Sequence, residues 1–300
     1  MFINSANWKD LKIISNYCRI TNNHLLYEKM LVKYSSFSEN FSKKQFIGKG
    51  FGEFSTNAYR KVKLNNQDLF EKVLKNNSID SKSVDYIFSN FDIISYVIKP
   101  FKMPRIIKVI DFSYLKIVYY EYLNLNSETI NPNEIYKLLK RIYKNIEVSP
   151  DFESDLLCNQ VFREGLDLLI FKYRNDKQSI LSKMNLVENV FAHGDLNMNN
   201  INSFVLLDWD RCGFYPKGYD LAYYLIEMNS DSIYDIDKSF KLAKDIYDDS
   251  SKDFENVFII YTVIFYLRVK RYNGCIIDEK IVRNLISKTG FFSKYSKTEE

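Results

Sequence analysis

The segment from Val190 to Asp220, VFAHGDLNMNNINSFVLLDWDRCGFYPKGYD, has the most informative pattern of residues in the chain. His193, one of only two histidines, is followed two residues later by Asp195. Asn200 comes five residues after that carboxylate. Eight residues beyond Asn200, an apolar run typical of a strand ends abruptly in Asp208. Three polar residues therefore precede a short apolar run at fixed spacings, and a fourth, Asp208, ends that run.

This spacing is typical of a site for phosphoryl transfer. Such a reaction needs one carboxylate beside the acceptor hydroxyl, together with an Asn and a second carboxylate that hold magnesium on the phosphates. The H-x-D-x-x-x-x-N spacing, followed by a strand that ends in Asp, is how kinases arrange these groups. We expect Asp195 to orient and deprotonate the acceptor hydroxyl. We expect Asn200 and Asp208 to bind Mg²⁺, a hard cation that prefers oxygen ligands.

An ordinary surface turn is the alternative interpretation of His193-Gly194-Asp195, because Gly and Asp are both favoured in turns. The downstream strand that ends in Asp-Trp-Asp, and the Gly-Tyr-Asp-Leu-Ala sequence that begins at Gly218, favour the kinase interpretation. Within that site we expect His193 to brace the catalytic loop by hydrogen bonding and not to transfer protons.

The segment His193–Asp220 resembles the aminoglycoside phosphotransferase and choline kinase family, and weaker similarity extends from about Phe46 to about Met228. The resemblance implies an α+β, two-lobed protein-kinase-like fold. Its small N-terminal lobe has an antiparallel sheet, and its larger C-terminal lobe is mainly helical. Residues 1–123 would form the nucleotide-binding lobe with a helical N-terminal extension. Residues 124–300 would form the catalytic and acceptor-binding lobe.

The sequence departs from the protein kinases in ways that predict a different substrate. Gly194 replaces the Arg of H-R-D, and Asp208-Trp209-Asp210 replaces D-F-G. That Arg normally reads the phosphate on an activation loop, so its loss removes the usual electrostatic switch. The sequence therefore predicts a constitutive kinase of small molecules.

A glycine-rich stretch near the N-terminus predicts a phosphate-binding hairpin. Residues 46–52 read FIGKGFG, and an alternating strand-like run covers residues 58–64. A hairpin of this kind lets backbone N–H groups approach phosphates closely, although a plain hairpin is the alternative. The residues that we expect to bind the phosphates are Gly48, Gly50, Gly52 and Ser55.

Lys72 occupies the place of the strand lysine that binds the α- and β-phosphates in kinases. Alternation along a strand points Lys72 to the same side as Phe70 and Leu74, which is unusual for a solvated lysine. A solvated Lys72 is nevertheless the alternative. Residues 78–96 contain no Glu to position this lysine. We expect Asp85, thirteen residues after Lys72, to take that role.

Further elements are predicted around these residues. Periodic apolar residues predict two short helices between Trp8 and Val32, and we expect Asp80 to cap the following helix. Residues 115–120 read as a strand. By the resemblance this strand enters a hinge at which backbone groups of Glu121 and Leu123 contact the adenine.

From Pro132 to the C-terminus the chain is predicted to be mostly helical, interrupted by the catalytic segment. Pro132 begins a helix that places Ile135, Leu138, Leu139 and Ile142 on one face. The apolar stretch 257–267 is too short to cross a bilayer and predicts a buried helix. Asp220 lies at a third helix start, where capping is the ordinary role. The resemblance adds a bracing contact from Asp220 to the catalytic loop.

Composition excludes several classes of protein. The chain has 300 residues, of which 46% are apolar, and this suffices for a globular core. A net charge of +4 is too small to predict nucleic-acid binding. The four cysteines are scattered without a C-x-x-C pair, which predicts neither zinc nor a disulfide framework and fits a reduced, cytoplasmic setting. We expect no integral membrane segment, and the sequence does not define the oligomeric state.

The acceptor is less well specified than the reaction. From Lys217 to Glu255 there are ten acids and five lysines. By the resemblance to aminoglycoside kinases this excess favours a cationic acceptor, and a solvated helical face is the alternative. The 23 Tyr and 23 Phe also allow an aromatic cage for a choline-like cation or a stacked sugar.

We therefore expect an ATP- and Mg²⁺-dependent kinase that acts on a hydroxyl of a small metabolite. The acceptor would be a sugar, a choline-like amino alcohol or an aminoglycoside. A kinase-like binding module that has lost catalysis is the alternative. The absence of a helix Glu supports that alternative, whereas the intact Asp195, Asn200 and Asp208 argue against it.

Overall fold

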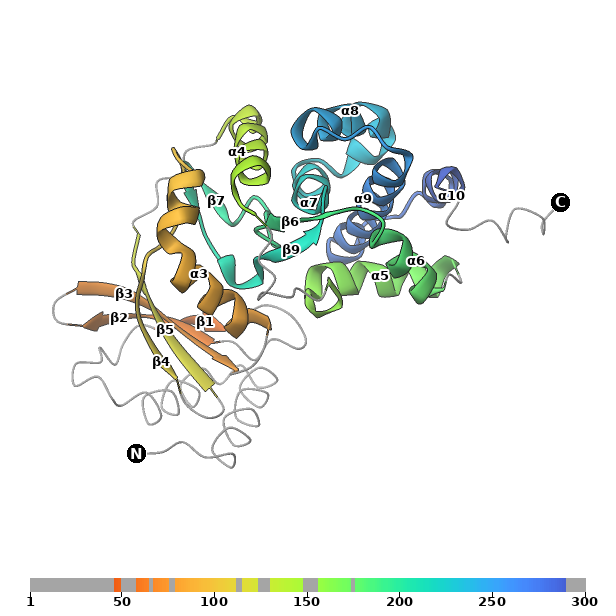
Figure 1. The fold of residues 1–300 in the computed structure, drawn as a ribbon. Helices are drawn as coiled ribbons and strands as arrows, with labels where there is room; N and C mark the ends of the chain where they lie inside the picture. The colour runs from red at the N-terminus through yellow and green to blue at the C-terminus, as the bar shows by residue number, and fades with distance from the viewer. Residues whose placement is uncertain are drawn as a thin grey trace. The chain divides into compact units, whose positions relative to one another are not determined.

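The computed structural model describes residues 46–49, 58–64, 67–75, 79–111, 115–123, 130–147, 156–173 and 176–289. The chain divides into two compact units. The first takes residues up to Phe91 and Met103–Leu125, and the second takes Asp92–Lys102 and residues from Asn126 onward (Figure 1). The helices expected between Trp8 and Val32, and the expected phosphate-binding residues Gly50, Gly52 and Ser55, lie outside the described residues.

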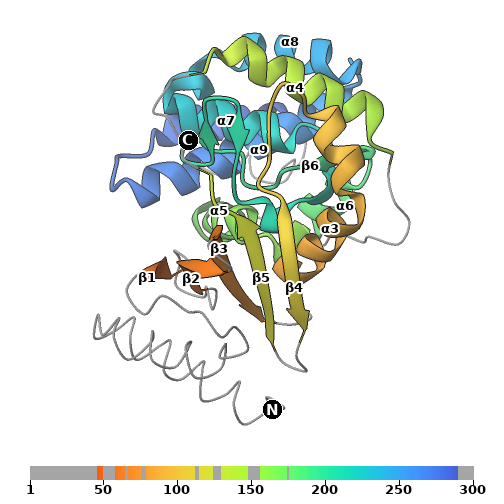
Figure 2. The same cartoon turned by 90° about the vertical axis from the view of Figure 1, so that its left-hand side faces the viewer.

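The first unit is built on a five-stranded antiparallel sheet in the order β1-β2-β3-β5-β4 (Figure 2). The strands are β1 (Phe46–Lys49), β2 (Ala58–Leu64), β3 (Gln67–Lys75), β4 (Ile106–Asp111) and β5 (Leu115–Glu121). The strands predicted at residues 58–64 and 115–120 are confirmed as β2 and β5. Helix α3 (Ile79–Val97) follows β3 in the chain.

Helix α3 begins earlier than the sequence suggested. It already includes Ile79, so Asp80 lies in its first turn and the predicted cap at Asp80 is wrong. An acid in the first turn still interacts favourably with the helix dipole. The helix is interrupted at Asn90, whose φ of −114° and ψ of 16° are not helical. The division between the two units follows directly, after Phe91.

The second unit is mainly helical. Its helices are α4 (Pro132–Asn145), α5 (Gln160–Tyr173), α6 (Lys177–Met184), α7 (Tyr219–Met228), α8 (Ile236–Tyr247), α9 (Lys252–Tyr272) and α10 (Glu279–Lys288). In α4, Asn131 caps the first turn and the four predicted apolar residues are buried. The predicted α+β class, with a small antiparallel sheet and a larger mainly helical part, is confirmed.

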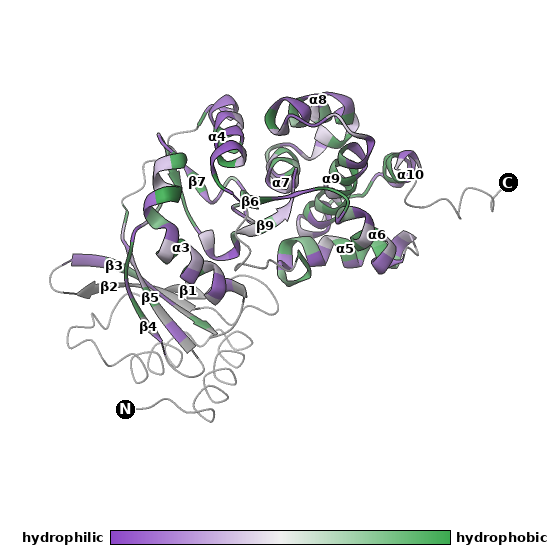
Figure 3. Ribbon diagram, viewed as in Figure 1, coloured by the Kyte–Doolittle hydropathy of each residue, from purple (hydrophilic) through white to green (hydrophobic). Residues whose placement is uncertain are grey.

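Helix α9 forms the core of the second unit. Every residue from Val257 to Leu267 is buried, which confirms the prediction of a buried helix. Figure 3 shows many hydrophobic residues along α9. Helices α5 and α7 pack against α9. A Cβ atom at Gly165 in α5 would lie 2.3 Å from the carbonyl oxygen of Ile264, so the two backbones approach closely. No helix among the described residues is long and apolar enough to span a membrane.

Four short strands flank the predicted catalytic residues. β6 (Asn189–Ala192) pairs with β9 (Gly213–Pro216), and β7 (Ile201–Asn202) pairs with β8 (Val205–Leu206). The apolar run before Asp208 gives a shorter strand than the sequence suggested, because Ser203, at φ 48°, turns the chain immediately before it. β6 ends and β7 begins on either side of residues 193–200, and these two strands fix the ends of that loop.

The close approach of α5 and α9 gives a test of the packing. In Gly165→Ala the new methyl group overpacks the contact with Ile264, at a cost of about 1–3 kcal/mol in the free energy of unfolding. The roughly 1 kcal/mol that Ala gains over Gly in helix propensity offsets part of this cost, so we expect a net loss of up to about 2 kcal/mol. Urea unfolding measures the change. Asp167→Ala, at an exposed position of the same helix, is the control and should change stability by less than about 0.5 kcal/mol. A stabilised Gly165→Ala variant would contradict the packing.

Candidate active site

The start of the predicted catalytic loop, residues 193–200, is held by one buried carboxylate. Asp220 Oδ2 accepts a hydrogen bond from the backbone N–H of His193 at 2.6 Å. Its Oδ1 accepts one from the N–H of Gly194 at 3.0 Å. The helix cap of α7 is Gly218 and has no side-chain bond, so the capping role expected for Asp220 is wrong. The bracing contact that the resemblance implied is present instead.

Burial raises the pKa of Asp220 to about 7. The two N–H donors favour the charged form and oppose this shift, whereas the neighbouring charge of Asp195 adds to it. Burial therefore disfavours the charged form of Asp220, and the two hydrogen bonds from the backbone offset part of that cost.

Gly194 is the residue that the loop geometry requires after His193. Its φ of +79° is in the left-handed region, which disfavours residues with a side chain. An added Cβ would lie 1.9 Å from the carbonyl oxygen of Arg211. The Gly194 carbonyl accepts from Asn159 Nδ2 at 2.9 Å and from the Tyr219 hydroxyl at 3.4 Å. A larger residue at this position would displace the loop.

His193 lies within the site as a neutral brace. Its Nε2 is 2.8 Å from the carbonyl oxygen of Leu207, and its Nδ1 accepts from the Asp195 N–H at 3.3 Å. Because a carbonyl can only accept, Nε2 carries the proton and Nδ1 has none. Burial lowers the pKa of His193, which favours this neutral form. The geometry supports the bracing role that we expected.

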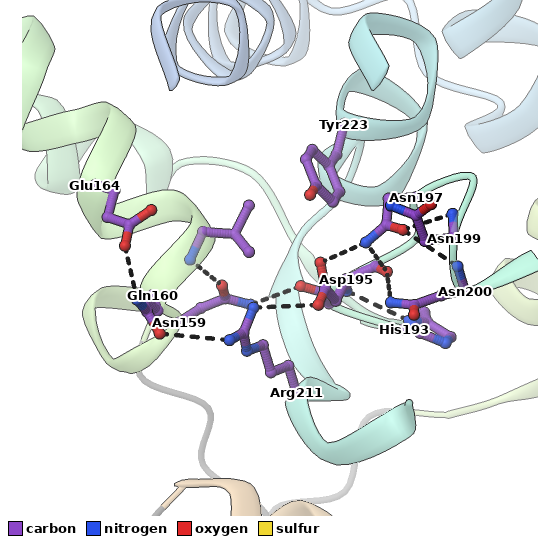
Figure 4. A network of polar contacts seen from close by, with 12 residues as sticks. Asn159, Gln160, Glu164, His193, Asp195, Asn197, Asn199, Asn200, Arg211 and Tyr223 are labelled. Carbon is purple, nitrogen blue, oxygen red and sulfur yellow. Dashed lines mark hydrogen bonds and ion pairs between the residues drawn. The ribbon is translucent and has the colours of Figure 1, made fainter. Parts of the chain in front are cut away.

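Both oxygens of the Asp195 carboxylate are oriented by neighbouring side chains (Figure 4). Oδ1 accepts from Asn197 Nδ2 at 3.0 Å, and Oδ2 pairs with Arg211 Nη1 at 3.1 Å. The side chain is buried but retains an exposed fraction of 11%. Since each carboxylate oxygen can accept two hydrogen bonds, both keep capacity for a further donor.

Asn197 shapes the second half of the loop. Its side-chain oxygen accepts from the N–H groups of Asn199 at 2.9 Å and Asn200 at 3.2 Å. This local turn presents the side chain of Asn200, whose Nδ2 donates to the Asp195 carbonyl at 2.9 Å. The sequence analysis missed Asn197, because the Asn-rich run offered several equivalent candidates.

The expected metal ligands have the chemistry that Mg²⁺ prefers. The Asn200 amide nitrogen is used on Asp195, which leaves the amide oxygen as the ligand atom. The backbone carbonyl of Asn200 accepts from the Leu207 N–H at 2.8 Å. Because Asp208 is the next residue in the chain, this bond holds Asp208 close to Asn200. Asp208 is exposed and left-handed, at φ 59° and ψ 57°, a strained conformation that is common at functional sites. An amide oxygen and an exposed carboxylate fit Mg²⁺.

No group of three or more His, Cys, Asp or Glu that could hold a metal ion occurs among the described residues. Mg²⁺ does not require such a group, because it is usually bound by one or two carboxylates together with substrate phosphates and water.

The first unit contains the described part of the expected nucleotide site. Lys72 is buried in β3 at 8% exposure and lies opposite Val118 of β5. Leu74 lies opposite Lys116 in the same register, so Lys72 and Lys116 share one face of the sheet. Lys116 is also buried, and its ammonium binds Asp85 as well as Asp111, the latter at 3.4 Å.

The sequence analysis overlooked Lys116, which is a described partner of Asp85. The Asp85 carboxylate contacts Lys116, and its pairing with Lys72 stays a prediction. Gly48 lies in β1 opposite Tyr59. Glu121 ends β5 and donates its N–H to the Arg105 carbonyl at 2.8 Å. Leu123, two residues later, is half-buried. Their contacts with adenine stay predictions.

The structure brings His193, Asp195, Asn200 and Asp208 together within the second unit. His193 bonds to the Asp195 N–H and to the carbonyl of Leu207, the residue before Asp208, and Asn200 bonds to the Asp195 carbonyl. Gly48, Lys72, Asp85, Glu121 and Leu123 belong to the first unit.

Six of the ten acids of the Lys217–Glu255 region are exposed, namely Asp231, Asp235, Asp237, Asp245, Asp248 and Asp253. Asp249 pairs with Lys217 at 2.7 Å, and Glu255 pairs with Lys252 at 3.0 Å. Glu227 differs, because it is half-buried, contacts Arg268 at 3.5 Å and is influenced by the charge of Asp195. The region is therefore closer to the solvated face of the alternative interpretation than to an acidic cleft.

Comparison with known proteins finds structural likenesses at low sequence identity. A spectinomycin phosphotransferase in complex with ADP and spectinomycin has 12% identity and a TM-score of 0.46, over 82% of this chain and 88% of that chain. An aminoglycoside phosphotransferase in complex with GDP and kanamycin has 10% identity and a TM-score of 0.49, over 90% and 99%. A putative fructosamine-3-kinase from Haemophilus somnus has 12% identity and a TM-score of 0.43, over 81% and 89%.

These three structures are phosphotransferases or kinases by name, the kind of protein that the sequence resemblance implied. No family model and no curated protein matches the chain. Because the identities are low and the TM-scores lie below 0.5, we base the function on this chain's own residues.

The raised pKa of Asp220 predicts a pH dependence of stability. The folded carboxyl titrates at about 7, whereas an unfolded Asp titrates at about 3.9. The folded state therefore binds this proton more tightly. The contribution of Asp220 to stability is fully present below about pH 4 and is lost as the pH rises through about 7.

We expect Asp220→Asn to remove this component from urea-unfolding free energies measured between pH 4 and pH 8. The informative quantity is the difference between the pH profiles of the two proteins, since other groups titrate in both. Asp167→Asn, which neutralises an exposed acid, should keep the wild-type profile. Parallel profiles for wild type and Asp220→Asn would show that Asp220 does not titrate in this range.

Proposed function

We propose that the protein is an ATP- and Mg²⁺-dependent kinase that transfers the γ-phosphate to a hydroxyl of a small metabolite. One observation carries the proposal. The Asp195 carboxylate is fixed on both oxygens, by Asn197 and Arg211, within a loop anchored on buried Asp220. Such a group can accept a proton from a hydroxyl without first reorganising.

The residues of the loop have distinct roles in this reaction. The acceptor hydroxyl donates a hydrogen bond to Asp195, and its oxygen bonds to the γ-phosphorus as the bond from that phosphorus to the β-phosphate oxygen breaks. The hydroxyl proton passes to the Asp195 carboxylate, and ADP leaves with the electron pair of the broken bond. Mg²⁺, when bound, neutralises charge on the phosphates, and the Asn200 amide oxygen and the Asp208 carboxylate would hold it.

We assign the nucleotide to the first unit's lysine-bearing sheet face. Lys72 is the cation that we propose for the α- and β-phosphates, supported by its burial in β3. Lys116 lies on the same face, and the carboxylates of Asp85 and Asp111 balance its charge, so Lys72 is the cation that the proposal depends on. Positive charge in a partly buried setting favours phosphate. Gly48, and the backbone of Glu121 and Leu123, complete the described part of the proposed nucleotide site.

The acceptor class stays open among sugars, choline-like amino alcohols and aminoglycosides. Side chains of both charges, including Glu164, Glu227 and Arg268, share the electrostatic surroundings of Asp195. This mixture suits a polar acceptor with several hydrogen-bonding groups.

We expect Asp195→Asn to lower acceptor-dependent turnover by about 10²–10⁴, since the amide cannot take the hydroxyl proton. Nucleotide binding should persist, because Asp195 acts on the acceptor. Asp208→Asn should weaken the Mg²⁺-dependent rise in melting temperature that nucleotide produces, because it removes a charge from the proposed metal site. ADP release and thermal shift, each with and without Mg²⁺, measure the two effects.

Asp167→Asn, an exposed substitution of the same kind, should leave both readouts unchanged. Undiminished turnover in Asp195→Asn would mean that another carboxylate serves the acceptor. Nucleotide binding without turnover in the wild type, for every acceptor class, would instead favour the binding module.

A further inference from the structure

A chain of hydrogen bonds leads away from the catalytic carboxylate along helix α5 (Figure 4). Arg211 binds Asp195 Oδ2 through Nη1 at 3.1 Å, and its Nη2 donates to Gln160 Oε1 at 3.4 Å. The amide nitrogen of Gln160 donates in turn to Glu164 Oε1 at 2.7 Å. Arg211 and Gln160 therefore each bond to two neighbouring side chains, and each uses a different atom for each neighbour.

The chain ends at the half-buried guanidinium of Arg268 in α9, which contacts side chains of α5 and α7. Glu164 Oε2 accepts from Arg268 Nε at 3.2 Å. Arg268 Nη1 reaches the Tyr223 hydroxyl at 3.1 Å and Glu227 at 3.5 Å. Burial by itself would lower the pKa of Arg268, but the charges of its neighbours, Tyr223 and Glu164 foremost, raise it. The guanidinium stays charged and gives the chain a fixed end.

Gln160 is the neutral link between a cation and an anion. Arg211 offers only donors, and the Glu164 carboxylate offers only acceptors. A side chain between them must present an acceptor to one and a donor to the other, which an amide does in one orientation only. A carboxylate at position 160 would still accept from Arg211, but it would repel Glu164.

We propose that Gln160 and Glu164 are positioning residues for the catalytic carboxylate. They hold the guanidinium of Arg211 so that it fixes Asp195 Oδ2, while the remaining acceptor capacity of Asp195 serves the substrate hydroxyl. This inference rests on the proposed kinase function. Arg211 has a long side chain with many rotamers, and a single contact to Asp195 would leave it mobile. The second contact, to Gln160, restricts it.

An exchange of the two side chains tests this relay. Gln160→Glu should lower kcat about tenfold, because the carboxylates at positions 160 and 164 then repel each other, and the displaced side chain at 160 draws Arg211 away from the position in which it fixes Asp195. Glu164→Gln should lower kcat about threefold. Gln160 and Arg268 both donate to position 164, and an amide there presents a donor to one of them. In the double variant, the carboxylate at position 160 accepts from Arg211. The amide at position 164 donates to that carboxylate and accepts from Arg268. That variant should recover kcat to within about threefold of wild type.

The nucleotide KM should stay constant in all four proteins, since the relay acts on Asp195. Two exposed substitutions are the matched controls: Gln178→Glu on α6 adds a charge, and Asp167→Asn on α5 removes one. Both should keep the wild-type kcat. Urea unfolding of the same four proteins gives a double-mutant cycle, which detects the coupling between positions 160 and 164 without any turnover.

Failure of the inference and failure of the proposed function give different results. Equal kcat in wild type and Gln160→Glu, or a double variant no better than the worse single variant, would overturn the relay. Coupling in stability without a change in kcat would also overturn it, because the residues would then be structural only. A wild-type protein that binds nucleotide and turns over no acceptor would instead reject the kinase function, together with the inference that rests on it.

Discussion

The site depends on two hydrogen bonds from a backbone turn to the buried carboxylate of Asp220. These bonds fix the N–H groups of His193 and Gly194, at 2.6 and 3.0 Å, to the first turn of α7. Helix α7 is itself packed on α9, the buried helix of the core. The position of Asp195 therefore follows from the packing of the helices, through a buried carboxyl group whose hydrogen-bond donors come from the loop itself.

Two strained residues become understandable from this constraint. With His193 and Gly194 anchored, the chain must turn at Gly194, and only a residue without Cβ fits against the Arg211 carbonyl. His193 then spans from the Asp195 N–H to the Leu207 carbonyl and sets the distance between the loop and the residue before Asp208. The left-handed conformation of Asp208 directs the next residues into the short turn that ends at Arg211. A preorganised site stores strain of this kind.

The sequence predicted the parts of the protein that are local in the chain. His193, Asp195, Asn200 and Asp208 lie within one short segment, and the apolar face of α4 follows from helical spacing alone. Contacts between distant segments were missed. Asn159 bonds to the Gly194 carbonyl across 35 residues, and Lys116 binds Asp85 across 31. No spacing rule connects such pairs, because packing brings them together. The function of Asp220 was ambiguous for the same reason.

The most direct measurement follows the fate of a labelled γ-phosphate. The protein is incubated with Mg²⁺, γ-labelled ATP and, in turn, sugars, amino alcohols and aminoglycosides, and the products are separated. We expect the label to appear on a hydroxyl of one acceptor class in a stable phosphate ester, in equal amount to the ADP formed. Label that stays in ATP, or appears only as inorganic phosphate whatever the acceptor, would contradict phosphoryl transfer to a small-molecule hydroxyl.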